Sequence, residues 1–97
     1  MFQILTFEKR PWGWMIKFLH TRSFWMKLLR VTGRTSLQSH EHRTEYHFSF
    51  WRTNKIHIGE HHRMLPGWYL EIALGRPDEN DIIRYEDDYG RIPTANE

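Results

Sequence analysis

The polar stretch Gln38–Glu45, which reads QSHEHRTE, contains several side chains that can bind a metal ion. Successive side chains of an extended strand point to opposite faces, so Gln38, His40 and His42 would share one face. Glu45 has the opposite parity, and it can join them only if the chain bends in between and a new strand begins near Glu45. Imidazole, carboxylate and amide oxygen atoms together suit one divalent zinc, manganese, iron, cobalt or nickel ion.

A further ligand must come from farther along the chain, where three histidines lie close together in IHIGEHHR. The candidates are His57, His61 and His62. Histidines beside glutamate and arginine are also typical of a solvated, hydrogen-bonded surface. The pattern alone therefore leaves two interpretations open, a metal site and a polar surface.

Size and composition indicate one small domain over residues 1–97. The absence of cysteine excludes disulfides and thiolate metal sites. Acidic and basic residues at 8–10 interrupt the first apolar run too early for a secretory signal, and no apolar stretch approaches membrane-spanning length. We expect a soluble, cytoplasmic protein with no membrane partner.

Charge is unevenly distributed along the chain. Residues 1–63 contain eleven lysines and arginines against four acidic residues, whereas residues 64–97 contain three against eight. A basic, aromatic-rich first part can indicate nucleic-acid binding. The basic residues are scattered singly, however, so mutual neutralisation within one fold is the favoured interpretation, and we expect no nucleic-acid partner.

Short apolar runs that alternate with polar residues predict an all-β protein, either a sandwich or a barrel. Turn signals rich in glycine, proline and asparagine separate the runs. One helical turn is expected over 78–85. The predicted strands cover residues 15–19, 24–29, 46–51 and 68–74.

Four segments of the sequence resemble the small cupin domain of type II mannose-6-phosphate isomerases, in the same order and with similar spacing across residues 9–91. The segments are KRPWGW (9–14), SLQSHEHRTE (36–45), IHIGEHHR (56–63) and DIIRYEDDYGR (81–91). The resemblance implies a small cupin, a jelly-roll β-barrel. Only sixteen residues separate Glu45 from His62, about half the family's usual spacing, which implies that one β-hairpin of the barrel is missing.

The resemblance also implies a set of metal ligands. Gln38, His40 and Glu45 match the first cupin motif, with glutamine in place of the first histidine. The second motif selects His62 as the fourth ligand. His42 then faces the substrate or supports the ligands, with a ligand role as the alternative.

The activity implied is that of a metal-dependent sugar-phosphate isomerase, which moves a proton between adjacent carbons through an enediol. The alternatives are a non-catalytic metal- or sugar-binding cupin, favoured because a shortened barrel would expose the metal to water, and another metal-dependent cupin reaction such as dioxygenation. An ion pair between Arg91 and Asp87 or Asp88 is the competing role for Arg91. The expected catalytic residues are Arg91, His42 and Glu60, and the expected substrate-binding residues are Arg43, Arg63, Arg10 and His47.

Three aromatic side chains are expected on the outward face of one predicted strand. If Glu45 points at the metal, Tyr46, Phe48 and Phe50 point away from it. Exposed aromatic surface is unfavourable in water, so either a second copy of the chain or the segment Phe2–Phe7 must cover it. We expect a homodimer.

Overall fold

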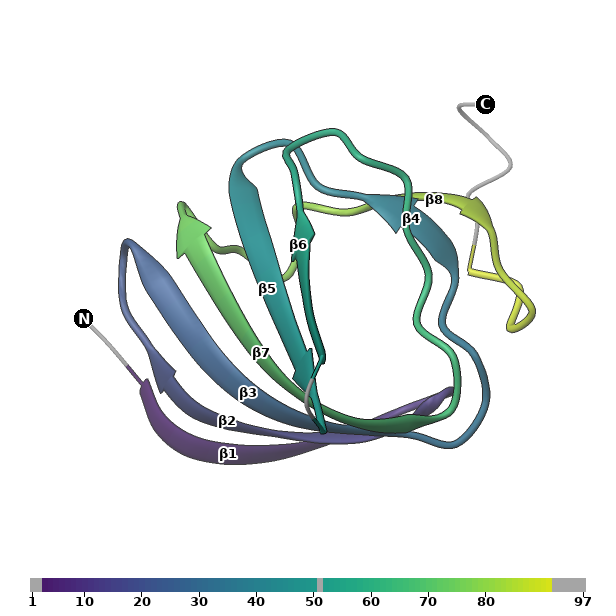
Figure 1. Ribbon diagram of the computed structural model, residues 1–97, viewed down its shortest axis with the longest axis horizontal. Helices are drawn as coiled ribbons and strands as arrows, with labels where there is room; N and C mark the ends of the chain where they lie inside the picture. Colours follow the sequence, from purple (N-terminus) through teal and green to yellow (C-terminus); the bar gives the residue numbers. More distant parts are fainter. Residues whose placement is uncertain (1–2, 51, 92–97) are drawn as a thin grey trace.

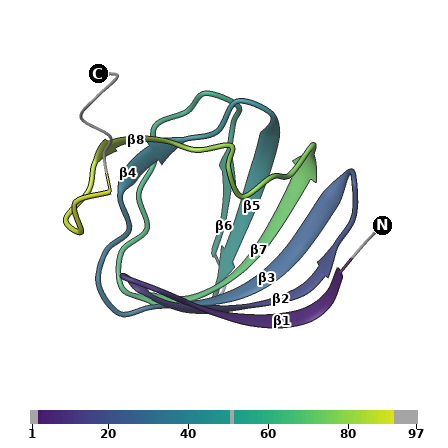
Figure 2. The ribbon, with the colours of Figure 1, turned by 180° about the vertical axis from the view of Figure 1, so that it is seen from behind.

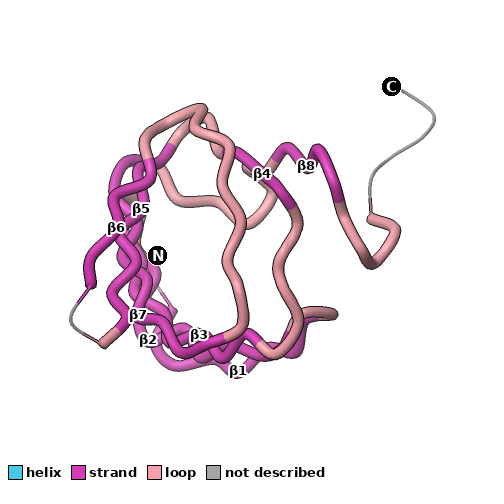
Figure 3. Tube along the Cα trace, turned by 45° about the vertical axis from the view of Figure 1, so that its right-hand side comes forward, coloured by secondary structure: helices cyan, strands magenta, loops and turns pink. Residues whose placement is uncertain are grey.

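The computed structural model describes residues 3–50 and 52–91, which form eight antiparallel strands and no helix (Figure 3). This part of the chain therefore has no helix that could cross a membrane. Six strands form one sheet in the order β1 (Gln3–Arg10), β2 (Gly13–His20), β3 (Phe24–Val31), β7 (Gly67–Gly75), β5 (Arg43–Ser49) and β6 (Arg52–Ile56). The other two, β4 (Leu37–Ser39) and β8 (Ile83–Glu86), pair with each other.

The large sheet is strongly curved, and the β4–β8 pair lies across its concave side (Figures 1 and 2). The segment 57–66, between β6 and β7, crosses the same side as a loop (Figure 3). The prediction of an all-β fold is confirmed, since every strand pairing is antiparallel.

The predicted strands 15–19, 24–29 and 68–74 fall within β2, β3 and β7. The strand predicted at 46–51 begins earlier, at Arg43, and its last residue lies outside the described residues. The helical turn expected over 78–85 is wrong. A tight turn forms at Asp78–Asp81 instead, and the chain then extends as β8, because pairing with β4 satisfies its backbone groups.

The apolar core is small and lies at one end of the concave side. It consists of Trp12, Met15, Leu29, Val31 and Met64. Trp12 enters it from the β1–β2 turn. A side chain at the following Gly13 would place its Cβ 2.0 Å from the Arg30 carbonyl oxygen, so only glycine fits there. The rest of the concave interior is not apolar.

Charged side chains fill the remainder of the concave interior. Lys17, Lys27, Arg43, Glu45 and Glu71 are all buried, with at most 6% of their surface exposed. A buried charge is tolerated only when it is paired and hydrogen-bonded. Ion pairs therefore determine how the interior is arranged. Some of the partners in these pairs must come from the loops.

The loop after β7 supplies the negative charge that the two lysines require. Glu79 Oε2 lies 2.9 Å from Lys17 Nζ and 2.8 Å from Lys27 Nζ. Burial would raise the pKa of the Glu79 carboxyl, but the two lysines outweigh burial and lower that pKa to about 2. The loop is also tied to the sheet by Arg43 Nη1, which donates to the Asp78 carbonyl at 2.7 Å.

The convex side of the sheet carries a central apolar row. Paired residues place five apolar side chains in one row across five strands, namely Phe7, Ile16, Leu28, Leu70 and Phe48. No described residue covers this row. The segment from Gln3 onward extends the sheet as β1, at the edge opposite β6, so the expectation that it could fold over Phe48 is wrong for the described residues.

Replacement of Glu79 with glutamine should destabilise the protein, because it removes the carboxylate that pairs directly with both buried lysines, Lys17 and Lys27. Breaking a fully buried pair costs about 3–5 kcal/mol, and partial exposure of Glu79 reduces the expected loss of unfolding free energy to about 2–3 kcal/mol. Urea denaturation at pH 7 measures it.

The matched control is Asp88→Asn, which breaks the exposed Arg34–Asp88 pair and should lower the free energy of unfolding far less than Glu79→Gln does, because solvent screens an exposed pair. The Glu79 contribution should be complete above pH 4.5, the ordinary pKa of this carboxyl, and should disappear as the pH falls toward 2. Equal losses for the two variants would contradict the role given to Glu79.

Candidate metal centre

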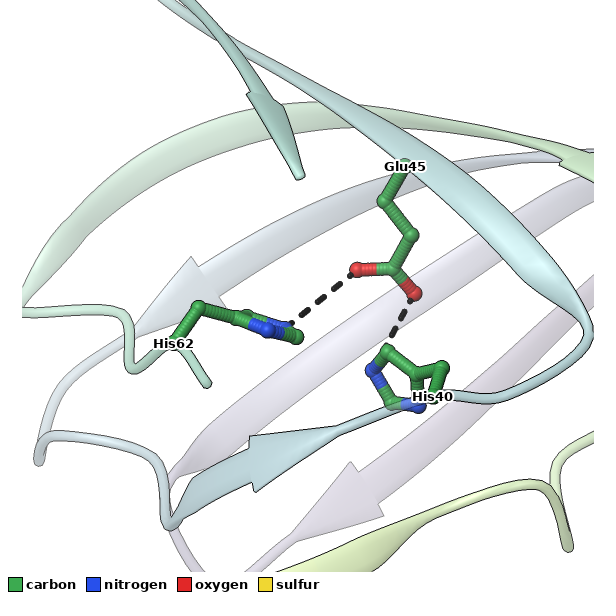
Figure 4. Close-up of side chains that lie close together, drawn as sticks. All are labelled: His40, Glu45 and His62. Carbon is green, nitrogen blue, oxygen red and sulfur yellow. Dashed lines mark ion pairs between the residues drawn. The ribbon is translucent and has the colours of Figure 1, made fainter. Parts of the chain in front are cut away.

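Three of the four predicted metal ligands converge inside the concave side (Figure 4). Glu45 Oε2 lies 3.5 Å from His40 Nε2, and Glu45 Oε1 lies 3.6 Å from His62 Nε2. The three residues are 2%, 2% and 8% exposed. The expectation that a shortened barrel would open this site to water is therefore wrong for the His40–Glu45–His62 group.

The predicted bend between His40 and Glu45 is present, and it explains how residues of opposite parity meet. Strand β4 ends at Ser39, the chain bends at residues 41–42, and β5 begins at Arg43. The Asp81 carboxylate accepts both backbone N–H groups of the bend at 2.9 Å. Glu45 thereby turns back toward His40.

His62 reaches the site through the backbone. Gln38 and His62 exchange two N–H···O hydrogen bonds of 2.8 Å, which fixes the 57–66 loop against β4. The other two candidates in this loop stay outside, because His57 is exposed and His61 stacks on Tyr85 at 3.9 Å between ring centroids. Of the three histidines considered, only His62 meets Glu45.

The orientation of both imidazoles favours a metal ion. His40 Nδ1 lies 2.7 Å from the Asp81 carbonyl oxygen, and His62 Nδ1 lies 3.1 Å from the Glu60 carbonyl oxygen. A carbonyl oxygen only accepts, so each Nδ1 carries a proton, and in the neutral ring each Nε2 has a lone pair on the side of Glu45. Burial lowers the pKa of His40, which keeps it neutral.

His62 Nε2 is the atom that most needs a ligand. It is buried, and it has no hydrogen-bond partner within residues 3–50 and 52–91. A lone pair that faces a carboxylate oxygen at 3.6 Å is unfavourable unless a proton or a metal ion lies between them. Gln38 also lies beside the group, with its amide nitrogen 3.4 Å from His40 Nε2, and a rotation of that amide would present oxygen instead.

Arg43 occupies a different position from the one predicted. Its Nε donates to Glu45 Oε2 at 2.7 Å, and its Nη2 lies 3.2 Å from His40 Nε2. The guanidinium, predicted to bind substrate, is thus a counter-charge for Glu45. Its contacts allow a competing interpretation, in which the group is a closed polar network, but Arg43 forms no hydrogen bond with His62 Nε2.

His47 is buried next to the same carboxylate. Its Nε2 lies 3.0 Å from Glu45 Oε1 and 3.1 Å from Glu71 Oε1, and Trp25 Nε1 donates to Glu71 at 2.8 Å. Burial would lower the pKa of His47, but the two carboxylates outweigh burial and raise it to about 10. Burial likewise would raise the pKa of Glu45, but His47 and Arg43 hold it well below its usual range.

The Glu45–His47–Glu71 group can also hold a metal by its residue types. His47 Nε2 already lies within hydrogen-bond distance of both carboxylates, however, so this group needs no metal ion to satisfy its polar atoms. His47, which was predicted to bind substrate, is thus held between two carboxylates in the interior.

Two predicted catalytic residues lie apart from the His40–Glu45–His62 group. His42 is exposed and lines a hollow at the rim of the sheet together with Arg22 and Arg76. Glu60 is exposed, and its carboxylate accepts the backbone N–H of His57 at 2.9 Å. The bend that brings Glu45 inward turns His42 outward, so parity alone misplaced it.

The predicted arginines are all paired. Arg91 forms two hydrogen bonds to Asp87, at 2.8 and 3.0 Å, so the competing ion-pair role is present. Arg63 donates to the Thr35 carbonyl at 2.9 Å and faces Glu86. Arg10 pairs with Glu8.

A cavity of about 300 Å³ lies beside the group and is lined by Gln38 and Glu45 as well as by Arg10 and Arg91. A second cavity, of about 270 Å³, is lined by His62 and His47. The His40–Glu45–His62 group thus borders two cavities. Arg84 also lines the first cavity. The sequence does not predict it as a site residue, because no pattern in the neighbouring residues shows that its side chain is unpaired.

No protein-family model matches the chain, and neither a curated protein nor a solved structure matches it. Fold and site together define an all-β protein with a buried histidine–glutamate group that can hold a metal ion.

Removal of both imidazoles, in His40→Ala/His62→Ala, should abolish metal binding. Wild-type protein dialysed against zinc, manganese or cobalt should retain one ion per chain, and elemental analysis measures this. The absorption spectrum of the cobalt form should show coordination by nitrogen and oxygen.

The matched control is His42→Ala/His57→Ala, which also removes two histidines but alters only exposed side chains. It should bind metal as wild type does. Failure of the wild-type protein to retain any of these metals would support the closed-network interpretation instead.

Proposed function

We propose that the chain is a metal-binding small cupin whose ion is held by Gln38, His40, Glu45 and His62. The buried Nε2 of His62, which has no hydrogen-bond partner among the described residues, carries this proposal. Both histidines are already oriented by backbone carbonyls, as metal-bound histidines usually are.

The architecture is compatible with a jelly roll that lacks one hairpin. A curved antiparallel sheet faces a small second sheet, and both contribute to the site. The short β5–β6 hairpin and the 57–66 loop connect Glu45 to His62 where a longer connection is expected. The Gln38–His62 backbone pairing then closes the site.

The activity that we propose is sugar-phosphate isomerisation. A bound divalent ion would polarise the substrate carbonyl and stabilise the developing oxyanion. The chain itself excludes water from the group and keeps a proton on His47, in contact with Glu45. The adjacent cavities have room for a small molecule.

A non-catalytic metal- or sugar-binding cupin is the second candidate. The observation that favours it is the exposed position of His42 and Glu60, away from the His40–Glu45–His62 group. A dioxygenase is a further alternative from the resemblance, and it would require iron.

Turnover separates these candidates. The metal-loaded protein should convert mannose 6-phosphate to fructose 6-phosphate, and removal of the metal with a chelator should abolish the conversion. His40→Ala/His62→Ala is the matched inactive variant. Metal binding without turnover would favour the non-catalytic candidate, and oxygen consumption by the iron form would identify a dioxygenase.

We also propose that the protein is a homodimer that buries the convex face of the sheet. The row of Phe7, Ile16, Leu28, Leu70 and Phe48 contains no charge. Five strands at about 4.8 Å spacing span roughly 20 Å. A square of this size covers about half of the ~800 Å² that each partner contributes to a standard interface, and the apolar side chains around the row can supply the rest.

The side chains around the row support a second copy as the occupant. Trp68, Leu74 and Phe18 are 47%, 45% and 37% exposed on the strands that carry the row. An uncharged row is complementary to the same row on a second copy, as a two-fold symmetric interface requires.

Phe48→Glu should convert the dimer to a monomer or an aggregate, because it places a charge within the apolar row, at its β5 end. Light scattering at low micromolar concentration measures the mass. Ser23→Glu adds the same charge at an exposed turn and should leave the dimer intact. A wild-type monomer, with Phe48→Glu soluble and folded, would refute the dimer.

A further inference from the structure

Arg84 on β8 has no partner. Its Nε is buried without a hydrogen bond, and no hydrogen bond or ion pair involves its side chain among residues 3–50 and 52–91. Its neighbours Arg10 and Arg91 are paired with Glu8 and Asp87. An arginine that is partly buried and unpaired lowers stability, so its presence requires a reason.

Cations outnumber carboxylates around Arg84. Arg84 lines the cavity of about 300 Å³ together with the cations Arg10, Lys27, Arg43 and Arg91 and with the carboxylates of Glu45, Glu71 and Glu79. Burial lowers the pKa of Arg84, and the charges of Arg91 and Arg10 lower it further, although Asp87 acts in the opposite direction. An anion in the cavity would relieve the mutual repulsion and satisfy the buried N–H group.

The same cavity reaches the candidate metal ligands. Arg84 and Gln38 are directly paired across β4 and β8, so their side chains share a face. Glu45 lines the cavity as well. A volume of about 300 Å³ lies at the lower end of ligand pockets, so the cavity suits a small molecule.

We propose that Arg84, flanked by Arg10 and Arg91, binds the anionic group, a phosphate or a carboxylate, of a small molecule whose other end faces the metal ligands. The planar guanidinium can donate two parallel hydrogen bonds to such a group. Only the orientation toward the metal rests on the proposed function. Binding of the anion itself requires no metal.

The test uses the metal-free, chelator-treated full chain and inorganic phosphate as the probe. Phosphate should raise the melting temperature of the wild-type protein more than sodium chloride does at equal ionic strength. Arg84→Gln should melt at a higher temperature than wild type without phosphate, because it removes an unpaired charge. It should bind phosphate at least tenfold more weakly by calorimetry.

Two further variants sharpen the test. Arg84→Lys retains the charge but not the planar fork, so it should bind phosphate with intermediate affinity. Arg34→Gln removes an exposed arginine outside this cavity and should leave phosphate binding unchanged. Acetate in place of phosphate shows which of the two anionic groups the cavity prefers.

The proposal is overturned if Arg84→Gln binds phosphate as tightly as wild type, if it lowers the melting temperature, or if phosphate acts on the wild-type protein no more strongly than chloride. Metal stoichiometry, measured separately, tests the proposed function. A wild-type protein that binds phosphate through Arg84 but retains no metal would support the anion site and contradict the metal-binding proposal.

Discussion

Burial of charge on the concave face of the six-stranded sheet is the constraint on which the rest of the structure depends. Glu45 lies at the centre of this charge and contacts Arg43 and His47, each of which is also tied to another part of the chain. Charged groups in an apolar interior are stable only when their partners are in place. The strands therefore cannot be separated from the loops that complete them.

The loop after β7 shows how neutralisation and site geometry are coupled. Glu79 neutralises Lys17 and Lys27, and two residues later the Asp81 carbonyl fixes the tautomer of His40. The Asp81 carboxylate also holds the bend before β5. One loop thus stabilises the sheet and orients His40, so the loss of the Glu79 ion pairs should affect both.

A short connection between Glu45 and His62 does not leave the site open. The 57–66 loop crosses the concave side of the sheet and is fixed by two hydrogen bonds between His62 and Gln38. Its Glu60 carbonyl orients the His62 ring. Because backbone pairing replaces side-chain packing here, the site stays buried in a chain with a small apolar core.

The sequence alone could predict those features that depend on the conformation of neighbouring residues in the chain. The alternation of apolar residues placed β2, β3 and β7, and the parity of Glu45 required a bend that is present, because both depend only on neighbouring residues. The tertiary structure decided that His62 approaches Glu45, that Arg43 neutralises it, and that Arg84 remains unpaired. These outcomes depend on which distant segments meet and which charges they bring, and no local pattern specifies that.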